Sequence, residues 1–239
     1  AGIGVDPPPD EIVNGRRFFY GGFTSAHGEQ ACASCHLFGD FDNLAWDLGA
    51  PDGQFHAPPP NMDDSFLSGF DPMKGPMTTQ SLRGLPGTGR LHWRADRENL
   101  AAFNPAFVDL MGRAAVLPDS EMTAFGDFVM ALAYPPNPAQ HLDRTLPDAP
   151  ADQPSARRGQ IFFQSLPVDN DHTCDFCHAP PTGTNRQIIH AAALLGTQDM
   201  KSPQLRNLYR KTGFSDRPGA VNKRGFGFTH DGSFGTVFD

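Results

Sequence analysis

The sequence predicts an all-α protein of two small helical domains with long loops rich in proline and glycine. The 239 residues include 25 glycines and 23 prolines, a composition that favours ordered loops around a few helices. Only 38% of residues are hydrophobic, yet 20 phenylalanines argue against a disordered chain. Two helix-compatible runs, Glu11–Phe19 and Ser155–Phe163, carry apolar residues near one face. A large apolar cofactor in each domain would supply the core that the chain lacks.

The cysteines carry the strongest chemical signal. They form two pairs, each with two intervening residues and each followed directly by a histidine: Cys32, Cys35 and His36, then Cys174, Cys177 and His178. This is the pattern of covalent haem c attachment. Two thiols one helical turn apart can form thioethers with the vinyl groups of one porphyrin, and the adjacent histidine then binds the iron as proximal ligand. The sequence therefore predicts two haem c groups, haem 1 and haem 2 in chain order.

Other readings of the cysteines explain less. A zinc ribbon wants about 15–20 residues between its two CxxC pairs, whereas well over a hundred separate these two. A thioredoxin-like redox pair needs a βαβ setting, which the proline- and glycine-rich surroundings do not supply. Structural disulfides would leave the histidine after each pair unexplained.

An internal repeat surrounds the two haem sites. Each site follows a helix-compatible run that ends in two phenylalanines, and each precedes a segment with methionine, leucine and arginine at the same offsets. The matching segments are Gly15–Phe19 with Gly159–Phe163, Met77–Gly84 with Met200–Asn207, and His92–Arg94 with His230–Gly232. The repeat predicts two domains of the same type.

A third helix closes the first domain. It is predicted to begin at an N-cap of Asp119 or Ser120, to carry an apolar stripe from Met122 to Leu132, and to stop before Pro135. We expect domain 1 at residues 1–137, a linker at 138–154 and domain 2 at 155–239. The second domain has no counterpart of this helix, so we expect a missing C-terminal segment or a partner in a larger complex to complete it.

These residues resemble two known groups. The first helix, the CxxCH site and the methionine loop with a closing helix resemble class I cytochrome c domains. Met200–Leu208 and Phe228–Phe234 resemble the C-terminal haem domain of bacterial di-haem cytochrome c peroxidases and the related MauG group, where the stretches read approximately KxPxLRN and PYxHDGSF. Gly227 and Phe228 stand where the peroxidases have Pro-Tyr, so this chain is not a close member.

The sixth iron ligand separates electron transfer from catalysis. Iron held by histidine and methionine is suited to passing single electrons, whereas an open site admits peroxide. The resemblance favours Met200 for haem 2, and Met77 is predicted for haem 1 because it aligns with Met200, with Met73 as a rival. The remaining alternatives are Met62, His56 and His92 for haem 1, and His190 and His230 for haem 2.

Other residues near the sites have weaker roles. Arg83 and Arg206 follow the two methionines and could pair with haem propionates, or form ordinary surface or interdomain ion pairs. Trp93 is expected to pack against a porphyrin edge. Asp40, Asp42, Asn43 and Asp47 could gather oxygen ligands for calcium, but the loop lacks the spacing of an EF-hand, so a solvated turn is favoured.

These expectations favour a carrier of single electrons between a protein donor and a protein acceptor. The net charge of −8, with scattered basic residues, disfavours nucleic acid and anionic membranes as partners, and no apolar stretch is long enough to span a bilayer. Haem c is attached outside the cytoplasm, which implies a periplasmic or extracellular location. The alternatives are an electron port of a larger enzyme, or a di-haem peroxidase or MauG-like oxidoreductase with a distal acid–base group such as Glu29.

Overall fold

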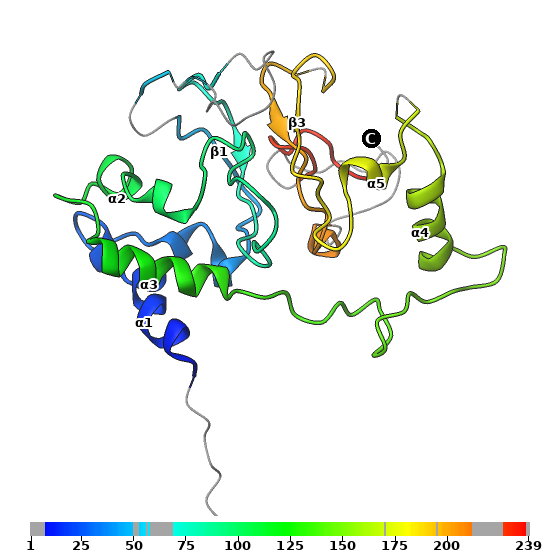
Figure 1. The fold of residues 1–239 in the computed structure, drawn as a ribbon, viewed down its shortest axis with the longest axis horizontal. Coiled ribbons are helices and arrows are strands. Elements are labelled where there is room, and N and C mark those ends of the chain that lie inside the picture. The colour runs from blue at the N-terminus through cyan, green and yellow to red at the C-terminus, as the bar shows by residue number, and fades with distance from the viewer. Residues whose placement is uncertain are drawn as a thin grey trace, which may run out of the picture.

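The structure is a computed structural model, which describes residues 8–49, 53–55, 57, 69–169, 171–194, 196–211 and 227–237. Figure 1 shows the N-terminal and C-terminal parts of the chain as two groups of elements joined by a long connection. We call residues 8–137 the first unit and residues 155–237 the second unit. Across the described ranges, no helix combines the length and the apolar character needed to cross a membrane.

The prediction of an all-α protein is wrong. The described residues contain five α-helices and two antiparallel sheets of two strands each. The helices are α1 (Asp10–Tyr20), α2 (Ala106–Asp109), α3 (Asp119–Met130), α4 (Ala156–Ser165) and α5 (Cys174–Cys177), and the strands are β1 (Ala45–Trp46), β2 (Met77–Thr78), β3 (Ile188–Ile189) and β4 (Met200–Lys201). The methionine segments and the two small hairpins pair their backbone groups in short strands and bridges rather than in helices.

The three predicted helices are present, with small differences at their ends. α1 and α4 match the two predicted runs to within one or two residues at each end. The Ser155 hydroxyl caps α4 by accepting the N–H of Arg158 at 3.1 Å. The N-cap of α3 is Pro118 rather than Asp119 or Ser120, because no side chain caps this helix and Asp119 is already helical.

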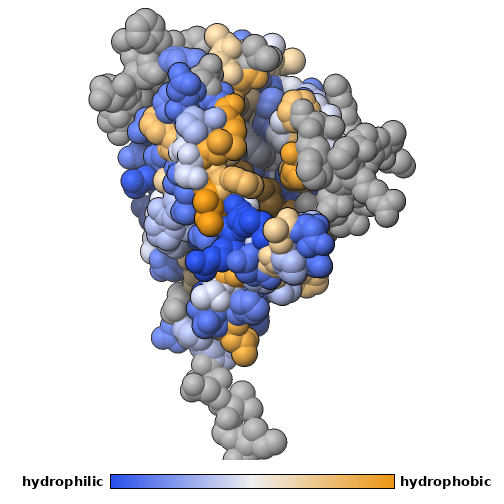
Figure 2. Space-filling model, turned by 90° about the vertical axis from the view of Figure 1, so that its right-hand side faces the viewer, coloured by the Kyte–Doolittle hydropathy of each residue, from blue (hydrophilic) through white to orange (hydrophobic). Residues whose placement is uncertain are grey.

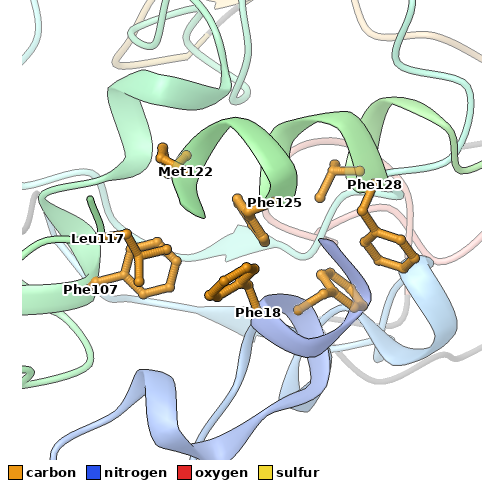
Figure 3. Close-up of a cluster of buried hydrophobic side chains, with 8 residues drawn as sticks. Phe18, Phe107, Leu117, Met122, Phe125 and Phe128 are labelled. Atoms are coloured by element: carbon orange, nitrogen blue, oxygen red, sulfur yellow. The ribbon is translucent and has the colours of Figure 1, made fainter. Parts of the chain in front are cut away.

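The main hydrophobic core lies where α1 crosses α3. Figure 3 shows Phe18 of α1 facing Phe125 of α3, with Phe107 of α2 and Leu117 of the loop before α3 at one end. At the other end the ring of Phe128 lies 5.5 Å from that of Phe19. The helices approach closely at Gly15, where an added Cβ would lie 2.0 Å from the carbonyl oxygen of Ala124. The cluster comprises Phe18, Phe19, Phe107, Leu117, Met122, Phe125, Phe128 and Val129.

The two methionine segments form matching strands. In the first unit Met77 of β2 pairs with Trp46 of β1, and in the second unit Met200 of β4 pairs with Ile189 of β3. The residue two positions after each methionine then donates its N–H to the residue just before the partner strand, at 3.1 Å in the first unit and 2.9 Å in the second. The ungapped alignment of Met77–Gly84 with Met200–Asn207 therefore corresponds to a repeated structure.

The two units hold each other by a reciprocal exchange of hydrogen bonds. The Lys201 N–H in β4 donates to the Trp93 carbonyl at 2.7 Å, and the Thr78 N–H in β2 donates to the His230 carbonyl at 2.6 Å. Each acceptor lies inside a small hairpin closed by one bridge, Leu91 to Arg97 and Phe228 to Phe234. This spacing matches Trp93 with His230, one residue away from the match of His92 with His230 that the sequence suggested.

Buried polar side chains reinforce this boundary. The Lys201 ammonium donates to the carbonyls of Thr88 and Arg90 in the first unit, and burial lowers the pKa of Lys201 to about 8. The Asn207 side-chain amide donates to both carboxylate oxygens of Asp40, at 3.0 and 3.1 Å. Because such groups must be hydrogen-bonded when buried, they fix how the units face each other.

Candidate haem-attachment sites

The four cysteines are free thiols, and each pair lies on one turn of helix. Cys32 begins a 3₁₀ turn in the first unit, whereas Cys174 and Cys177 are the two ends of α5 in the second unit. Burial raises the pKa of Cys32 to about 12 and also raises the pKa values of Cys35 and Cys177. All four cysteines are free, and each pair has the spacing of the haem c attachment pattern.

The two histidines of the CxxCH motifs are held in the same way. Nδ1 of His36 lies 2.9 Å from the Gln80 carbonyl oxygen, and Nδ1 of His178 lies 2.9 Å from the Pro203 carbonyl oxygen. Gln80 and Pro203 occupy equivalent positions of the repeat, three residues after Met77 and Met200. A histidine that binds a metal commonly donates its other ring N–H to such an oxygen, which fixes the ring and leaves Nε2 for the metal.

Burial favours the neutral form of both imidazoles. Burial lowers the pKa of His36 and of His178 below the ordinary value, although the carbonyl that faces Nδ1 acts in the opposite direction in each case. A histidine must be neutral to ligate a metal ion. The two rings are therefore prepared, in position and in protonation, for a metal at Nε2.

Further hydrogen bonds connect the second CxxCH segment to the loop that follows it. The Ser202 hydroxyl donates to the Cys177 carbonyl at 2.8 Å, and the Asn185 N–H donates to the same carbonyl at 2.7 Å. The Asn185 side chain donates to the Phe176 carbonyl at 2.9 Å. These bonds connect the turn that carries Cys174 and Cys177 to the strand that carries Met200.

The predicted methionine ligands lie on the loops that hold the histidines. Met200 is buried, with 6% of its surface exposed, and Met77 is half-buried. Each precedes the carbonyl that faces Nδ1 by three residues. Ligation by Met77 and Met200 stays a prediction. Met73 is 77% exposed, and Met62 lies outside the described residues.

The alternative histidine ligands have protein partners or lie elsewhere. Nδ1 of His92 lies 2.8 Å from the buried Asp96 carboxylate, and Nδ1 of His190 lies 3.7 Å from Asp199. The pKa of Asp96 is lowered overall, because hydrogen bonding and nearby cations outweigh the effect of its burial. His230 is tied through its backbone to Thr78. His56 falls outside the described residues.

The arginines that were matched to propionates are engaged by protein groups. Arg83 donates to the Phe38 carbonyl at 3.0 Å and lies 3.6 Å from Asp40. Arg206 donates to Gln204 at 2.6 Å and to the Gly84 carbonyl. The propionate contact of Arg83 and Arg206 therefore stays a prediction.

The acidic loop directs its carboxylates to different partners. Asp40 faces Arg83 and Asn207 at the boundary between the units. Asp42 instead accepts the N–H of Leu44 at 3.0 Å and the indole N–H of Trp46 at 2.8 Å. Within the described chain, no three histidine, cysteine or acidic side chains gather as a metal ion would need.

A cavity of about 1060 Å³ lies in the first unit, where α3 forms one of its walls. Its apolar lining includes Leu85 and Leu100, which also pack against the core cluster together with Cys32. α3 contributes Met122 and Gly126 to the lining. None of the CxxCH residues lines this cavity.

Sequence reasoning missed two cationic residues of this cavity. Arg90 lines it from the first unit and Arg186 from the second. Neither lies in a segment that the repeat marked, and the approach of Arg186 depends on how the units meet. Trp93, in contrast, was noted: its indole N–H donates to the Thr78 carbonyl at 2.8 Å, and its own carbonyl binds Lys201, so it bridges β2 and β4.

Comparisons with known proteins show a fold and no family. No family model matches the chain, and no curated protein does. A solved structure of Kuenenia stuttgartiensis hydrazine synthase, pressurised with 20 bar xenon, is similar with a TM-score of 0.63 at 18% identity, over 99% of this chain and 79% of that chain. At this identity the likeness concerns the fold alone. This neighbour is not a di-haem peroxidase or a MauG protein, so the comparison does not carry that narrower resemblance.

Proposed function

We propose that this protein is a di-haem c-type cytochrome that carries single electrons between protein redox partners. The observation that carries the proposal is the matched pair of histidines: His36 and His178 follow the two CxxC pairs, and each presents Nδ1 to a carbonyl at 2.9 Å. Two unrelated structural histidines would have no reason to use equivalent acceptors of a repeat. One metal ligand in each unit explains both.

The residues present fit a covalently bound haem. Cys32 and Cys35 would hold haem 1, Cys174 and Cys177 would hold haem 2, and Nε2 of the adjacent histidine would bind each iron. A bound haem supplies one-electron redox chemistry. The chain's own part is to fix the imidazoles and to hold the two units in one arrangement.

The boundary between the units supports transfer within the molecule. Trp93 is bonded to Thr78 on one side and to Lys201 on the other, and these two residues follow Met77 and Met200 directly. We propose that this short bonded stretch keeps the two haems at a fixed separation. A carrier with two fixed haems can accept an electron at one unit and release it from the other.

The external partners follow from charge and from the attachment chemistry. With a net charge of −8, the protein is expected to meet donors and acceptors through their basic surfaces. The rate of electron exchange with a basic cytochrome should therefore fall as ionic strength rises. Because haem c is attached outside the cytoplasm, we propose a periplasmic or extracellular location.

The likeness to hydrazine synthase favours a second candidate. That protein is an enzyme by its name, and its fold extends over 99% of this chain. In this version the two haems would serve as the electron port of a larger oxidoreductase. A rapid reaction of one haem with a small ligand such as carbon monoxide would favour this candidate, because a plain carrier keeps both irons six-coordinate.

The proposal is tested by haem content and potentials. Protein matured in a host with haem c machinery should show an intact mass that includes two haems, and acid–acetone should not extract the colour. Substituting Cys32 and Cys35 with alanine should remove one haem, and the same change at Cys174 and Cys177 should remove the other. A polypeptide mass without added haem would refute the proposal.

The sixth-ligand prediction has its own test. Met77→Leu and Met200→Leu should each lower the potential of one haem and leave the other nearly unchanged, because methionine ligation raises the potential. Unchanged potentials in both variants would place the sixth ligands elsewhere.

A further inference from the structure

Several cations surround one buried carboxylate at the first hairpin. The Asp96 carboxylate is 4% exposed and lies 2.8 Å from Nδ1 of His92 and 3.3 Å from Nη2 of Arg94. Arg97 also acts electrostatically on Asp96, and Lys74 is within reach of the same carboxylate. We call Lys74, Arg94 and Arg97 the hairpin cations. Three cations around one buried carboxylate leave positive charge that Asp96 alone does not balance.

Arg94 shows directly that an acceptor is missing. Its side chain is 4% exposed, and its Nη1 donates to the Asp71 carbonyl at 2.6 Å and to the Gln198 side chain at 3.0 Å. Its Nε, in contrast, is buried and has no hydrogen-bond partner in the described structure. A buried N–H without an acceptor is rare in proteins and points to a group that the chain itself does not supply.

The orphaned atom also indicates the kind of acceptor. Nε and Nη2 form the edge of a guanidinium that binds both oxygens of a carboxylate in paired hydrogen bonds. Asp96 reaches this edge of Arg94 through one oxygen only, at 3.3 Å to Nη2, because its other oxygen faces His92. The edge is therefore half used, and a second carboxylate would complete it.

The other two hairpin cations also lack a bonded acceptor among the described residues. No hydrogen bond or ion pair joins Nζ of Lys74 or the guanidinium of Arg97 to a protein oxygen there. Both side chains are half-buried. Burial lowers the pKa of Lys74, although Asp96 and, more weakly, Asp47 act in the opposite direction. Cations in such surroundings are stabilised by an anion.

The hairpin cations lie beside the first CxxCH segment. The indole N–H of Trp93 donates to the Thr78 carbonyl at 2.8 Å, and two residues further along the chain the Gln80 carbonyl faces Nδ1 of His36 at 2.9 Å. The pKa of His36 is lowered chiefly by burial, and His92 of the hairpin is among the charged groups that also act on it. An anion at the hairpin would therefore be close to a group bound at His36.

We infer that the hairpin cations bind the propionates of haem 1. The inference rests on the proposed function, because it takes haem 1 to be attached beside His36. A haem brings two carboxylates, whereas Arg83 and Arg206 are already engaged by protein groups. The same hairpin accepts the Lys201 N–H at the Trp93 carbonyl. The propionate contact would thus connect haem 1 to the boundary between the units.

The test is potentiometric titration of the intact di-haem protein in the variants Arg97→Gln and Lys74→Gln. Loss of a cation beside haem 1 should lower its potential, because the reduced haem carries one more negative charge than the oxidised haem. We expect up to about a tenfold fall in the ratio of reduced to oxidised haem 1, about 59 mV for one electron. Arg97→Lys keeps the charge and should retain most of the potential.

Arg16→Gln is the matched control, because Arg16 is an exposed arginine of the same unit on α1. It removes the same charge and should leave haem 1 unchanged. The two potentials are assigned with the variant that lacks Cys174 and Cys177. Propionate bending modes in resonance Raman spectra give a second readout, expected to shift in Arg97→Gln and Lys74→Gln and to stay constant in Arg16→Gln.

The outcomes separate this inference from the proposed function. A mass without haem in every variant would refute the function itself. Two attached haems, with the wild-type haem 1 potential and propionate modes in both Arg97→Gln and Lys74→Gln, would overturn the role of the hairpin cations and leave the function standing. An equal shift of the potential in Arg16→Gln would also overturn it, because the effect would then be one of net charge.

Discussion

The two units begin with similar helices that are buried to different extents. α1 buries Phe18 and Phe19 completely, at 1% and 0% exposed, under α3. In α4 the equivalent of Phe18 is Phe162, which is 60% exposed, and the adjacent Ile161 is 52% exposed. Figure 2 shows the side of the molecule on which α4 lies, with apolar surface between polar patches. The amphipathic sequence forms a helix in both units. A hydrophobic core forms on this helix in the first unit, where α3 packs against α1.

The aligned glycines of α1 and α4 show the same difference in packing. Gly15 is the point at which α1 touches α3, whereas its equivalent Gly159 has no atom within 4 Å of an added Cβ. The first unit therefore has a core before any cofactor binds. In the second unit α4 packs against no comparable helix, and hydrogen bonds to the first unit contribute to its order. This comparison can be tested with pairs of matched substitutions.

The largest effect is expected from the aligned phenylalanines. Phe18→Ala should lower the free energy of unfolding by about 3–5 kcal/mol, because it leaves a cavity in the main core. Phe162→Ala should change it by less than about 1 kcal/mol, since most of that ring is exposed. Urea titration followed by circular dichroism measures both. Similar losses in the two variants would show that α4 is covered in solution.

Substituting the aligned glycines with alanine should change the stability of the protein in opposite directions. Gly15→Ala places a methyl group against the backbone of α3 and should destabilise the protein by about 3 kcal/mol. Gly159→Ala meets empty space and should stabilise it by about 0.5–1 kcal/mol, through the better helix propensity of alanine. Thermal unfolding monitored at 222 nm distinguishes these outcomes. A loss at Gly159 would contradict the open surface of α4.

The two boundary hairpins should differ in acid sensitivity. Asp96 in the first hairpin is buried beside His92 and Arg94, and its pKa is lowered in the folded state. Its contribution is therefore fully present above the ordinary aspartate pKa of about 3.9, and it is lost only as the pH falls from that value toward the lower pKa of the folded state. Asp96→Asn should cost about 2 kcal/mol at pH 7 and somewhat less at pH 3, where part of the contribution is lost.

The control for this pH dependence is Asp231→Asn in the second hairpin. The pKa of Asp231 is also lowered, by hydrogen bonds from Ser233 and Thr229, although its partial burial acts against them. Because its carboxylate is less buried than that of Asp96, we expect a smaller loss at pH 7. Unfolding curves at pH 3, 5 and 7 measure both. Equal pH profiles for the two variants would contradict the comparison.

The smallest effect is expected at Thr78, the counterpart of Lys201. Its hydroxyl is buried and has no hydrogen-bond partner in the described structure. Thr78→Val keeps the shape of the side chain and removes this unpaired group, so it should stabilise the protein by up to about 1 kcal/mol. Equilibrium unfolding in urea tests this. A loss of more than about 0.5 kcal/mol would mean that the hydroxyl has a bonding partner.

Sequence reasoning predicted the features that depend on the local pattern of residues. The apolar periodicity predicted α1, α3 and α4, and the repeat predicted that Met77 and Met200 lie in equivalent segments. It could not predict β1 to β4, because strands of two residues show no alternation. The haem-site contacts were also hidden: Gln80 and Pro203 use backbone carbonyls, which no residue type marks. Arg186 was missed because only the docking of the units brings it to Gly89.

The reciprocal bonds at Trp93 and His230 have a consequence for how the polypeptide can be divided. Each unit donates one of these bonds and accepts the other, so each hairpin lacks its hydrogen-bond partner when the other unit is absent. The peptide that joins the two units takes no part in these bonds. Cleavage within 138–154 should yield two fragments that stay together as a complex. Separately expressed, each fragment should mature poorly until mixed with its complement.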